Sequence, residues 1–167
     1  MLKQIVQPTI INLKQAEEIF AELPPAIYSS TSAAPYYSSI GGHLRHILDI
    51  FKCIVNGIDS RIIDLTKRKR GTIVEQNPVE GQRYLRKIIS DLECISGLDP
   101  SIAIIIKDDL GMGMVEIPTT LGGGLNQAHS HAIHHFACIG YILHIHGTIL
   151  PNKVFGYNPT TPENQSI

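Results

Sequence analysis

Three histidines in apolar segments of the chain have the residue type and spacing of a metal site. His131 and His135 lie four residues apart in an apolar segment near the C-terminus, and His46 lies far upstream in another apolar segment. Four residues is slightly more than one turn of an α-helix, so His131 and His135 share a helix face. Two such imidazoles can occupy adjacent positions on one metal ion, and a third from a facing helix leaves open positions for water or substrate. The sequence therefore predicts a three-histidine metal site.

The same histidines also fit a purely structural role. A histidine on an apolar helix face is often a hydrogen-bonded core residue, and a chain with eight histidines contains some close pairs by chance. Buried neutral imidazoles need partners, which a metal ion would supply. Two other metal motifs are excluded. Ala132 stands where the zinc-protease motif HExxH requires Glu, and the chain lacks the Glu-x-x-His motifs and further carboxylates of a di-iron site.

Hydrophobic periodicity predicts four long helices that position these side chains. Pro78 begins the third helix, and Gly147 ends the fourth. The β-branched run SIAIIIK, followed by DDLGMG and MVEIP, predicts a small β-hairpin between the third and fourth helices. We therefore expect an all-α fold, a four-helix bundle in a single domain over residues 1–167, with an extended tail from about residue 148. The predicted helices cover residues 10–22, 40–56, 78–96 and 121–146.

Composition and charge limit the class of protein. The formal net charge of -1 gives no electrostatic reason to expect nucleic acid or an anionic membrane as a partner. The basic cluster 67–70 is expected on a solvated surface connection over residues 58–77. The most apolar stretch, 132–149, contains four histidines and is short for a membrane span. Three cysteines without a CxxC pair argue against a disulfide framework, and the start of the chain lacks signal-peptide features, so we expect a cytoplasmic protein.

Four segments of the chain resemble the DinB/YfiT-like superfamily of metal-binding helical proteins. The segment SHAIHHFACIGYIL, preceded by TTLGGGLNQAH, is similar to the fourth-helix signature of that family, and SSIGGHLRHILDIF is similar to its second-helix signature. DLTKRKRGTIVEQNP resembles the connection that follows in one branch, and FGYNPTT resembles the C-terminal tail. The four segments extend from about residue 38 to the C-terminus in the order of the family.

The resemblance implies a four-helix bundle in up-down-down-up order, often dimeric, that holds a divalent metal with three histidines. One ligand comes from the second helix and two come from the fourth. The matching residues of this chain are His46, His131 and His135, and the nearest rivals are His43 and His134, each one turn away. The ion implied is zinc or nickel, with iron in one branch.

The resemblance also implies a reaction class. Family members of known activity are thiol-dependent transferases and a mycothiol-dependent isomerase, so the implied partners are a small-molecule substrate and a low-molecular-weight thiol. A three-histidine metal can lower the pKa of a thiol or water and present it as a nucleophile to a small electrophile. The alternative is a non-catalytic metal-binding or stress-response module without substrate turnover.

Two positions near His46 qualify this expectation. One branch of the family often has a further histidine where this chain has Ile50. Asp49 is a candidate to orient a ligand histidine through a hydrogen bond, and it fits equally well as a helix-surface carboxylate.

The outer side of the last predicted helix is also apolar, at Ile133, Phe136, Ala137, Gly140 and Leu143. A helix that is apolar nearly all round must bury both of its faces. We therefore expect a homodimer through this face.

Overall fold

The computed structural model describes residues 1–150 and 152–161. None of the helices in this part of the chain combines the length and the hydropathy needed to cross a membrane. The elements in chain order are α1 (Lys3–Glu22), α2 (Pro25–Tyr28), α3 (Ile40–Gly57), β1 (Ile62–Asp64), the short 3-10 helix η1 (Ile73–Glu75), α4 (Pro78–Ile95), β2 (Ala103–Asp109), β3 (Met114–Thr120) and α5 (Leu121–Ile145).

The predicted all-α four-helix bundle, with its up-down-down-up order, is wrong. Besides the four long helices and the short α2, the described residues form a mixed three-stranded sheet in the order β1-β2-β3. The expected hairpin is the antiparallel pair β2 and β3, but β1 adds a parallel strand to β2, with Ile62 opposite Ile105. A strand of three residues leaves no periodic signal in the sequence, and its partner lies far along the chain. Ile63, in the segment expected to be a solvated connection, is fully buried.

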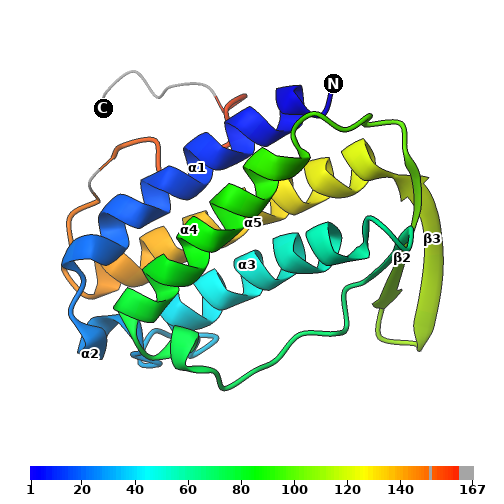
Figure 1. Cartoon of the computed structure of the whole chain (residues 1–167). Coiled ribbons are helices and arrows are strands. Elements are labelled where there is room, and N and C mark those ends of the chain that lie inside the picture. The colour runs from blue at the N-terminus through cyan, green and yellow to red at the C-terminus, as the bar shows by residue number, and fades with distance from the viewer. Residues whose placement is uncertain (151, 162–167) are drawn as a thin grey trace.

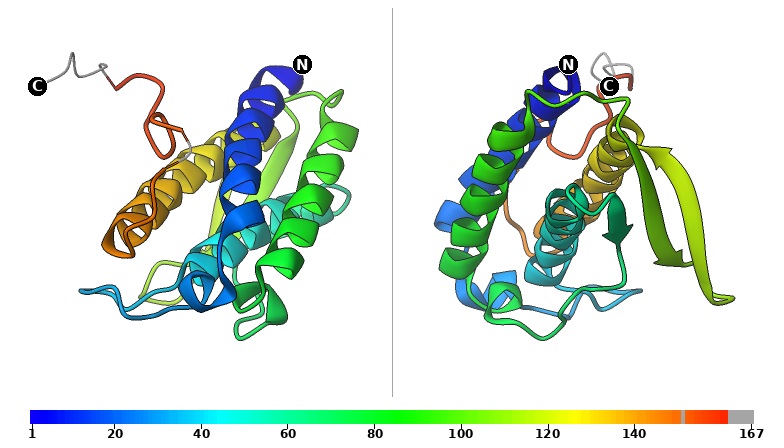
Figure 2. Two further views of the ribbon diagram at one scale, coloured as in Figure 1. Left: turned by 90° about the vertical axis from the view of Figure 1, so that its left-hand side faces the viewer. Right: turned by 45° about the vertical axis from the view of Figure 1, so that its right-hand side comes forward.

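The elements form three layers that place α3 and α5 in the middle. α1 packs against α4, α3 packs against α5, and the sheet lies beside α3 and α5 (Figures 1 and 2). One continuous hydrophobic core joins the helices to the sheet through Ile63, Ile104 and Ile106. The two helices that carry the three histidines are therefore neighbours along much of their length.

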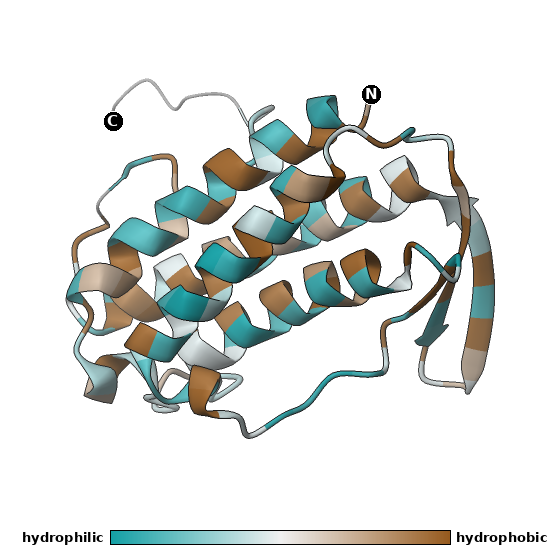
Figure 3. Ribbon diagram, in the orientation of Figure 1, coloured by the Kyte–Doolittle hydropathy of each residue, from teal (hydrophilic) through white to brown (hydrophobic). Residues whose placement is uncertain are grey.

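Local sequence signals explain where the long helices begin. The hydroxyl of Ser39 accepts a hydrogen bond from the amide of Gly42 at 3.0 Å, and the hydroxyl of Thr120 accepts one from Gly123 at 3.1 Å, as N-caps do. α3 carries both brown, hydrophobic residues and teal, hydrophilic ones (Figure 3), and its buried residues recur at the three- and four-residue spacing of an amphipathic helix. Glycines at the start of α5 permit close packing, since a Cβ on Gly122 would lie 2.9 Å from Pro100 Cβ.

The C-terminal segment lies against the outer side of α5. Phe155 is 3% exposed, and its ring centroid is 5.1 Å from that of Phe136. Phe136 and Leu143, expected on a dimer face, are buried within the chain. The tail from residue 148, expected to be extended, contains turns at 153–156, and its residues 151 and 162–167 lie outside the described residues.

Candidate metal centre

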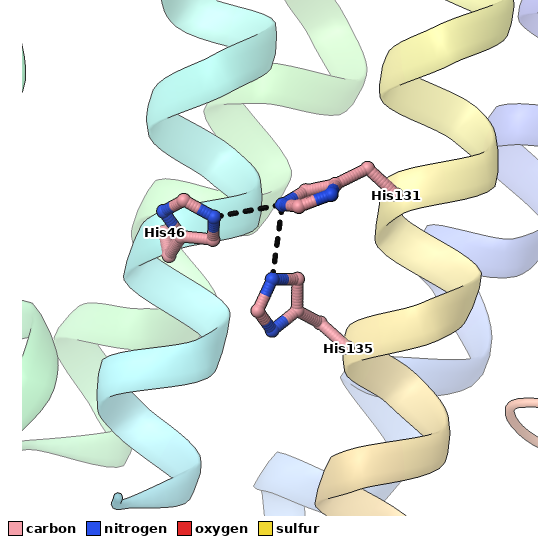
Figure 4. Close-up of side chains that lie close together, drawn as sticks. All are labelled: His46, His131 and His135. Atoms are coloured by element: carbon pink, nitrogen blue, oxygen red, sulfur yellow. Dashed lines mark hydrogen bonds between the residues drawn. The ribbon is translucent and has the colours of Figure 1, made fainter. Parts of the chain in front are cut away.

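The three predicted ligands meet between α3 and α5. His46 projects from α3, and His131 and His135 project from successive turns of α5 toward it (Figure 4). Each of the three is half-buried at the edge of the core, because the stripes next to it on both helices are apolar and packed. His46 and His131 are 85 residues apart in the sequence. The packing of α3 on α5 thus brings the three histidines together.

The Nε2 atoms of the three histidines converge. His131 Nε2 lies 2.8 Å from His46 Nε2 and 3.0 Å from His135 Nε2. One ligand nitrogen from each residue lies within 4.8 Å of the other two. These histidines therefore lie close enough to bind one metal ion.

The electrostatics of the cluster keep its imidazoles neutral. Burial and, next in size, the charge of Arg68 lower the pKa of His46 to about 4. Burial and the neighbouring histidines lower the pKa of His135 to about 3. Burial also lowers the pKa of His131. A neutral imidazole offers a nitrogen lone pair, and imidazole suits zinc, nickel, copper and iron. The donor set therefore fits a divalent transition metal, and three such ligands leave open positions.

His43, one of the two rival ligands, supports His135 from behind. Its Nδ1 lies 2.7 Å from His135 Nδ1, and its Nε2 lies 2.8 Å from Ser38 Oγ. If His135 carries its hydrogen on Nδ1, it donates to His43 Nδ1, and His43 Nε2 donates to Ser38. This assignment leaves His135 Nε2 bare toward the cluster, which is the usual arrangement behind a metal-binding histidine.

Arg68 is the neighbour of the cluster that the sequence analysis missed. Its Nη1 donates to His46 Nδ1 at 3.0 Å, although the basic cluster 67–70 was expected in solvent. A guanidinium only donates hydrogen bonds, so Nδ1 of His46 accepts, and the hydrogen of the neutral ring lies on Nε2. Nothing local in the sequence marks Arg68, because the contact depends on the path of the segment between β1 and η1.

The other candidates lie elsewhere. The rival His134 is exposed on α5, with its Nε2 3.9 Å from Cys138 Sγ. Asp49 accepts hydrogen bonds from Arg45 at 3.1 Å and from the Tyr84 hydroxyl at 2.8 Å, and no hydrogen bond joins it to a histidine of the cluster. Asp49 therefore neither orients a ligand histidine nor lies free on the helix surface. It belongs to a polar network with Arg45 and Tyr84 on another side of α3.

A cavity of about 250 Å³ adjoins the cluster. His46, His131 and Arg68 line it together with an apolar wall that includes Ile50 and Ile106. Its other wall is polar, with Asp108, Asp109 and Gln127. Ile50 presents a hydrocarbon surface next to the histidines. A small molecule with an apolar part could therefore reach the cluster.

Acid should destabilise the metal-free protein through these histidines. The folded-state pKa values of His46 and His135 lie below the ordinary 6.5, so below that pH the unfolded chain binds more protons than the folded one. The free energy of unfolding should then fall as pH drops from about 6.5 toward 4, by at most about 1.4 kcal/mol per pH unit for each histidine and by less where solvent reaches the rings. Guanidinium unfolding at pH 7.5, 6 and 5 in a chelator measures the slope. A H46A/H135A variant with an unchanged slope would contradict this assignment.

Comparisons of the chain with models of protein families, with curated proteins and with solved structures found no match. The converging histidines and the cavity beside them are therefore the features of this chain that bear on its function.

Proposed function

We propose that the protein is a metal-dependent enzyme that activates a thiol or water for attack on a small electrophile. The observation that carries the proposal is that two of the three converging histidines, His46 and His131, line a cavity, so the cluster is not enclosed in the core. A fully enclosed cluster would instead favour a metal that only stabilises the fold. The choice of a thiol comes from the resemblance of four segments to the DinB/YfiT-like superfamily, which has thiol-dependent members. This part of the proposal rests on those segments alone.

The residues of the chain have separate tasks in this proposal. His46, His131 and His135 hold the ion through Nε2, with zinc or nickel as the first candidates and iron as the third. When bound, the ion lowers the pKa of a thiol or water molecule at an open position. The apolar wall of the cavity binds the hydrocarbon part of the substrate and excludes water from it.

The first experiment is elemental analysis of protein purified without a histidine tag and without added metal. We expect close to one equivalent of a divalent metal per chain. The metal-loaded protein is then incubated with an electrophile such as an epoxide or an aryl halide, with and without a low-molecular-weight thiol, and the consumption of the electrophile is followed. Turnover that requires both metal and thiol supports a thiol transferase, and turnover without thiol supports a hydrolase.

Matched variants decide whether any activity belongs to this site. H46A and H135A should lose metal and turnover together, whereas H144A, an exposed histidine of the same helix α5, should retain both. Metal that is bound without any turnover would favour the non-catalytic metal-binding module. Protein without metal, and without any thermal stabilisation by added zinc or nickel, would contradict a metal site altogether.

We also propose that the protein is a homodimer, through the end of α5 rather than the face first expected. Tyr141 and Ile145 are 74% and 57% exposed there, and Ile149, just beyond the helix, is 90% exposed. Light scattering at micromolar concentration should give twice the mass of the chain. A Y141S/I145S variant should be monomeric, while I11S, at an equally exposed isoleucine of α1, should stay dimeric. A monomeric parent protein would contradict the proposal.

A further inference from the structure

A second and larger cavity lies on another side of α3. It has a volume of about 640 Å³ and lies between α3, α4 and the segment 58–77, which crosses below both helices in Figure 1. It shares no lining residue with the cavity beside the histidines. Its volume is in the range of small-molecule sites, roughly 300 to 1,000 Å³. We call it the basic cavity, because more cationic than acidic side chains line it.

The basic cluster 67–70 separates the two cavities. Lys67 and Lys69 line the basic cavity, whereas Arg68 lines the other one and contacts His46. The chain turns just before this point, where the amide of Arg68 donates to the Thr66 carbonyl at 2.8 Å, and Arg68 is directed to the other side from its two lysine neighbours. The basic cluster therefore contributes to the walls of both cavities. The prediction of a solvated surface loop did not include these contacts.

Cations outnumber carboxylates around the basic cavity. Lys52 on α3 and Lys69 on the segment 58–77 form no ion pair within the described residues. The whole chain has 14 Lys and Arg against 15 Asp and Glu, so the excess of cations here is local. The lining includes six cationic residues and three acidic ones. The other four cations form ion pairs, and those of Arg45 and Lys87 include Glu75 and Asp91, which lie outside the lining. Lys52 and Lys69 are therefore the cations of the cavity that are left for a ligand.

An oriented arginine forms the floor of the cavity. Arg45 is 9% exposed, its Nε donates to Glu75 at 2.8 Å and its Nη1 donates to Asp49 at 3.1 Å. Asp49 is held in turn by the Tyr84 hydroxyl. Nη2 of Arg45 makes no hydrogen bond within the described residues, so it is free to donate to a ligand. Thr72 Oγ1, on the cavity wall, is buried without a partner. Buried polar groups are nearly always satisfied, so this hydroxyl calls for a hydrogen-bond partner.

We propose that the basic cavity binds a small organic phosphate through Lys52, Lys69 and the free nitrogen of Arg45. Ammonium groups act as point charges for phosphate, and an arginine that is already fixed loses little conformational entropy on binding. Ile62 and Val74 on the wall provide an apolar surface for the organic part. The ring of Tyr84 lies beneath Lys52, whose Nζ is 5.5 Å from the ring centroid. The ligand is thus an anion with a phosphate at one end and a hydrophobic group at the other.

Calorimetric titration with phenyl phosphate and with inorganic phosphate tests this proposal. We expect phenyl phosphate to bind more tightly than inorganic phosphate, because only the former reaches the apolar wall. K52Q/K69Q should bind phenyl phosphate about tenfold more weakly or worse, since it loses two charge-assisted contacts. The control K3Q/K14Q removes the same charge from two exposed lysines of α1 that do not line the cavity, and should bind as the parent does.

The same titration in an H46A/H131A variant distinguishes binding in the basic cavity from binding to a metal ion at the histidines. Phosphate that bound to a metal ion would be lost in that variant, whereas binding in the basic cavity should be unchanged. The proposal is overturned if millimolar phenyl phosphate gives no heat of binding, or if K52Q/K69Q and K3Q/K14Q bind it equally well. Either result would leave the proposed function of the histidines untouched.

Discussion

Replacing His131 by alanine should weaken metal binding by at least about 100-fold. Loss of a residue that only supports a ligand typically costs 10- to 100-fold in affinity, and loss of a ligand itself should cost more. His131 is the most sensitive of the three, because its Nε2 lies within 3.0 Å of both other Nε2 atoms. Competition with a chromophoric chelator measures the affinity for zinc and for nickel.

Two variants bracket this result. H43A should weaken binding less, by about 10- to 100-fold, since His43 contacts His135 and not the centre of the cluster. H134A should bind metal as the parent does, because His134 is exposed and outside the cluster. An H134A variant that loses metal while H131A retains it would show that the rival, and not His131, is the ligand.

Arg68→Gln should change metal affinity in the opposite direction, and tighten it by up to about tenfold. In the structure Arg68 holds the hydrogen of His46 on Nε2, the atom that faces the other histidines and must be bare to bind metal. Glutamine can accept a hydrogen bond from Nδ1, which frees Nε2, and it removes a positive charge that opposes a cation. Arg68→Lys retains the charge and the donor, so its affinity should stay near that of the parent. Weaker binding by R68Q would contradict this role of Arg68.

The largest effect on stability is expected for Gly41→Ala, at about 3 kcal/mol of lost free energy of unfolding. A Cβ at Gly41 would overlap the carbonyl oxygen of Glu75 and approach Tyr28 Cε1 to 2.5 Å. Neither atom can move freely. Tyr28 is fully buried with its hydroxyl donating to the Val74 carbonyl at 2.7 Å, and the Glu75 carbonyl belongs to the backbone of η1. Chemical denaturation monitored by circular dichroism measures the loss.

Gly140→Ala is the matched control for this prediction. Gly140 lies inside α5, and a Cβ there would meet only methyl groups of Leu150 at 4.0 Å, which is ordinary contact. Alanine is favoured over glycine inside a helix by about 0.8 to 1 kcal/mol, so this variant should be as stable as the parent or more so. Equal effects of the two substitutions would show that the close approach of Gly41 to Glu75 does not limit stability.

The sequence by itself predicted the four long helices and the relative placement of two of the three histidines. The bounds of the first helix were wrong, because α1 begins at Lys3 and contains Pro8, whereas the prediction began at residue 10. Apolar periodicity and capping residues act over one or two turns, so Ser39, Pro78 and Thr120 mark helix starts that the structure retains. The face shared by His131 and His135 follows from helical pitch alone. Helical pitch does not tell where a distant helix lies. His46 was therefore assigned as the third ligand from the resemblance of its segment to the DinB/YfiT-like superfamily.

Only the tertiary structure decided how these elements meet. β1 exists because Ile62 and Ile63 pair with a strand about forty residues away, and a three-residue strand has no periodicity of its own. The turns of the segment 58–77 place Arg68 on His46 and its two lysine neighbours in another cavity, although all three belong to one run of similar charges. The outer face of α5 is apolar because Phe155 covers part of it, which one helix considered alone cannot show. Contacts of this kind depend on packing between segments remote in the sequence, and local physical chemistry does not encode them.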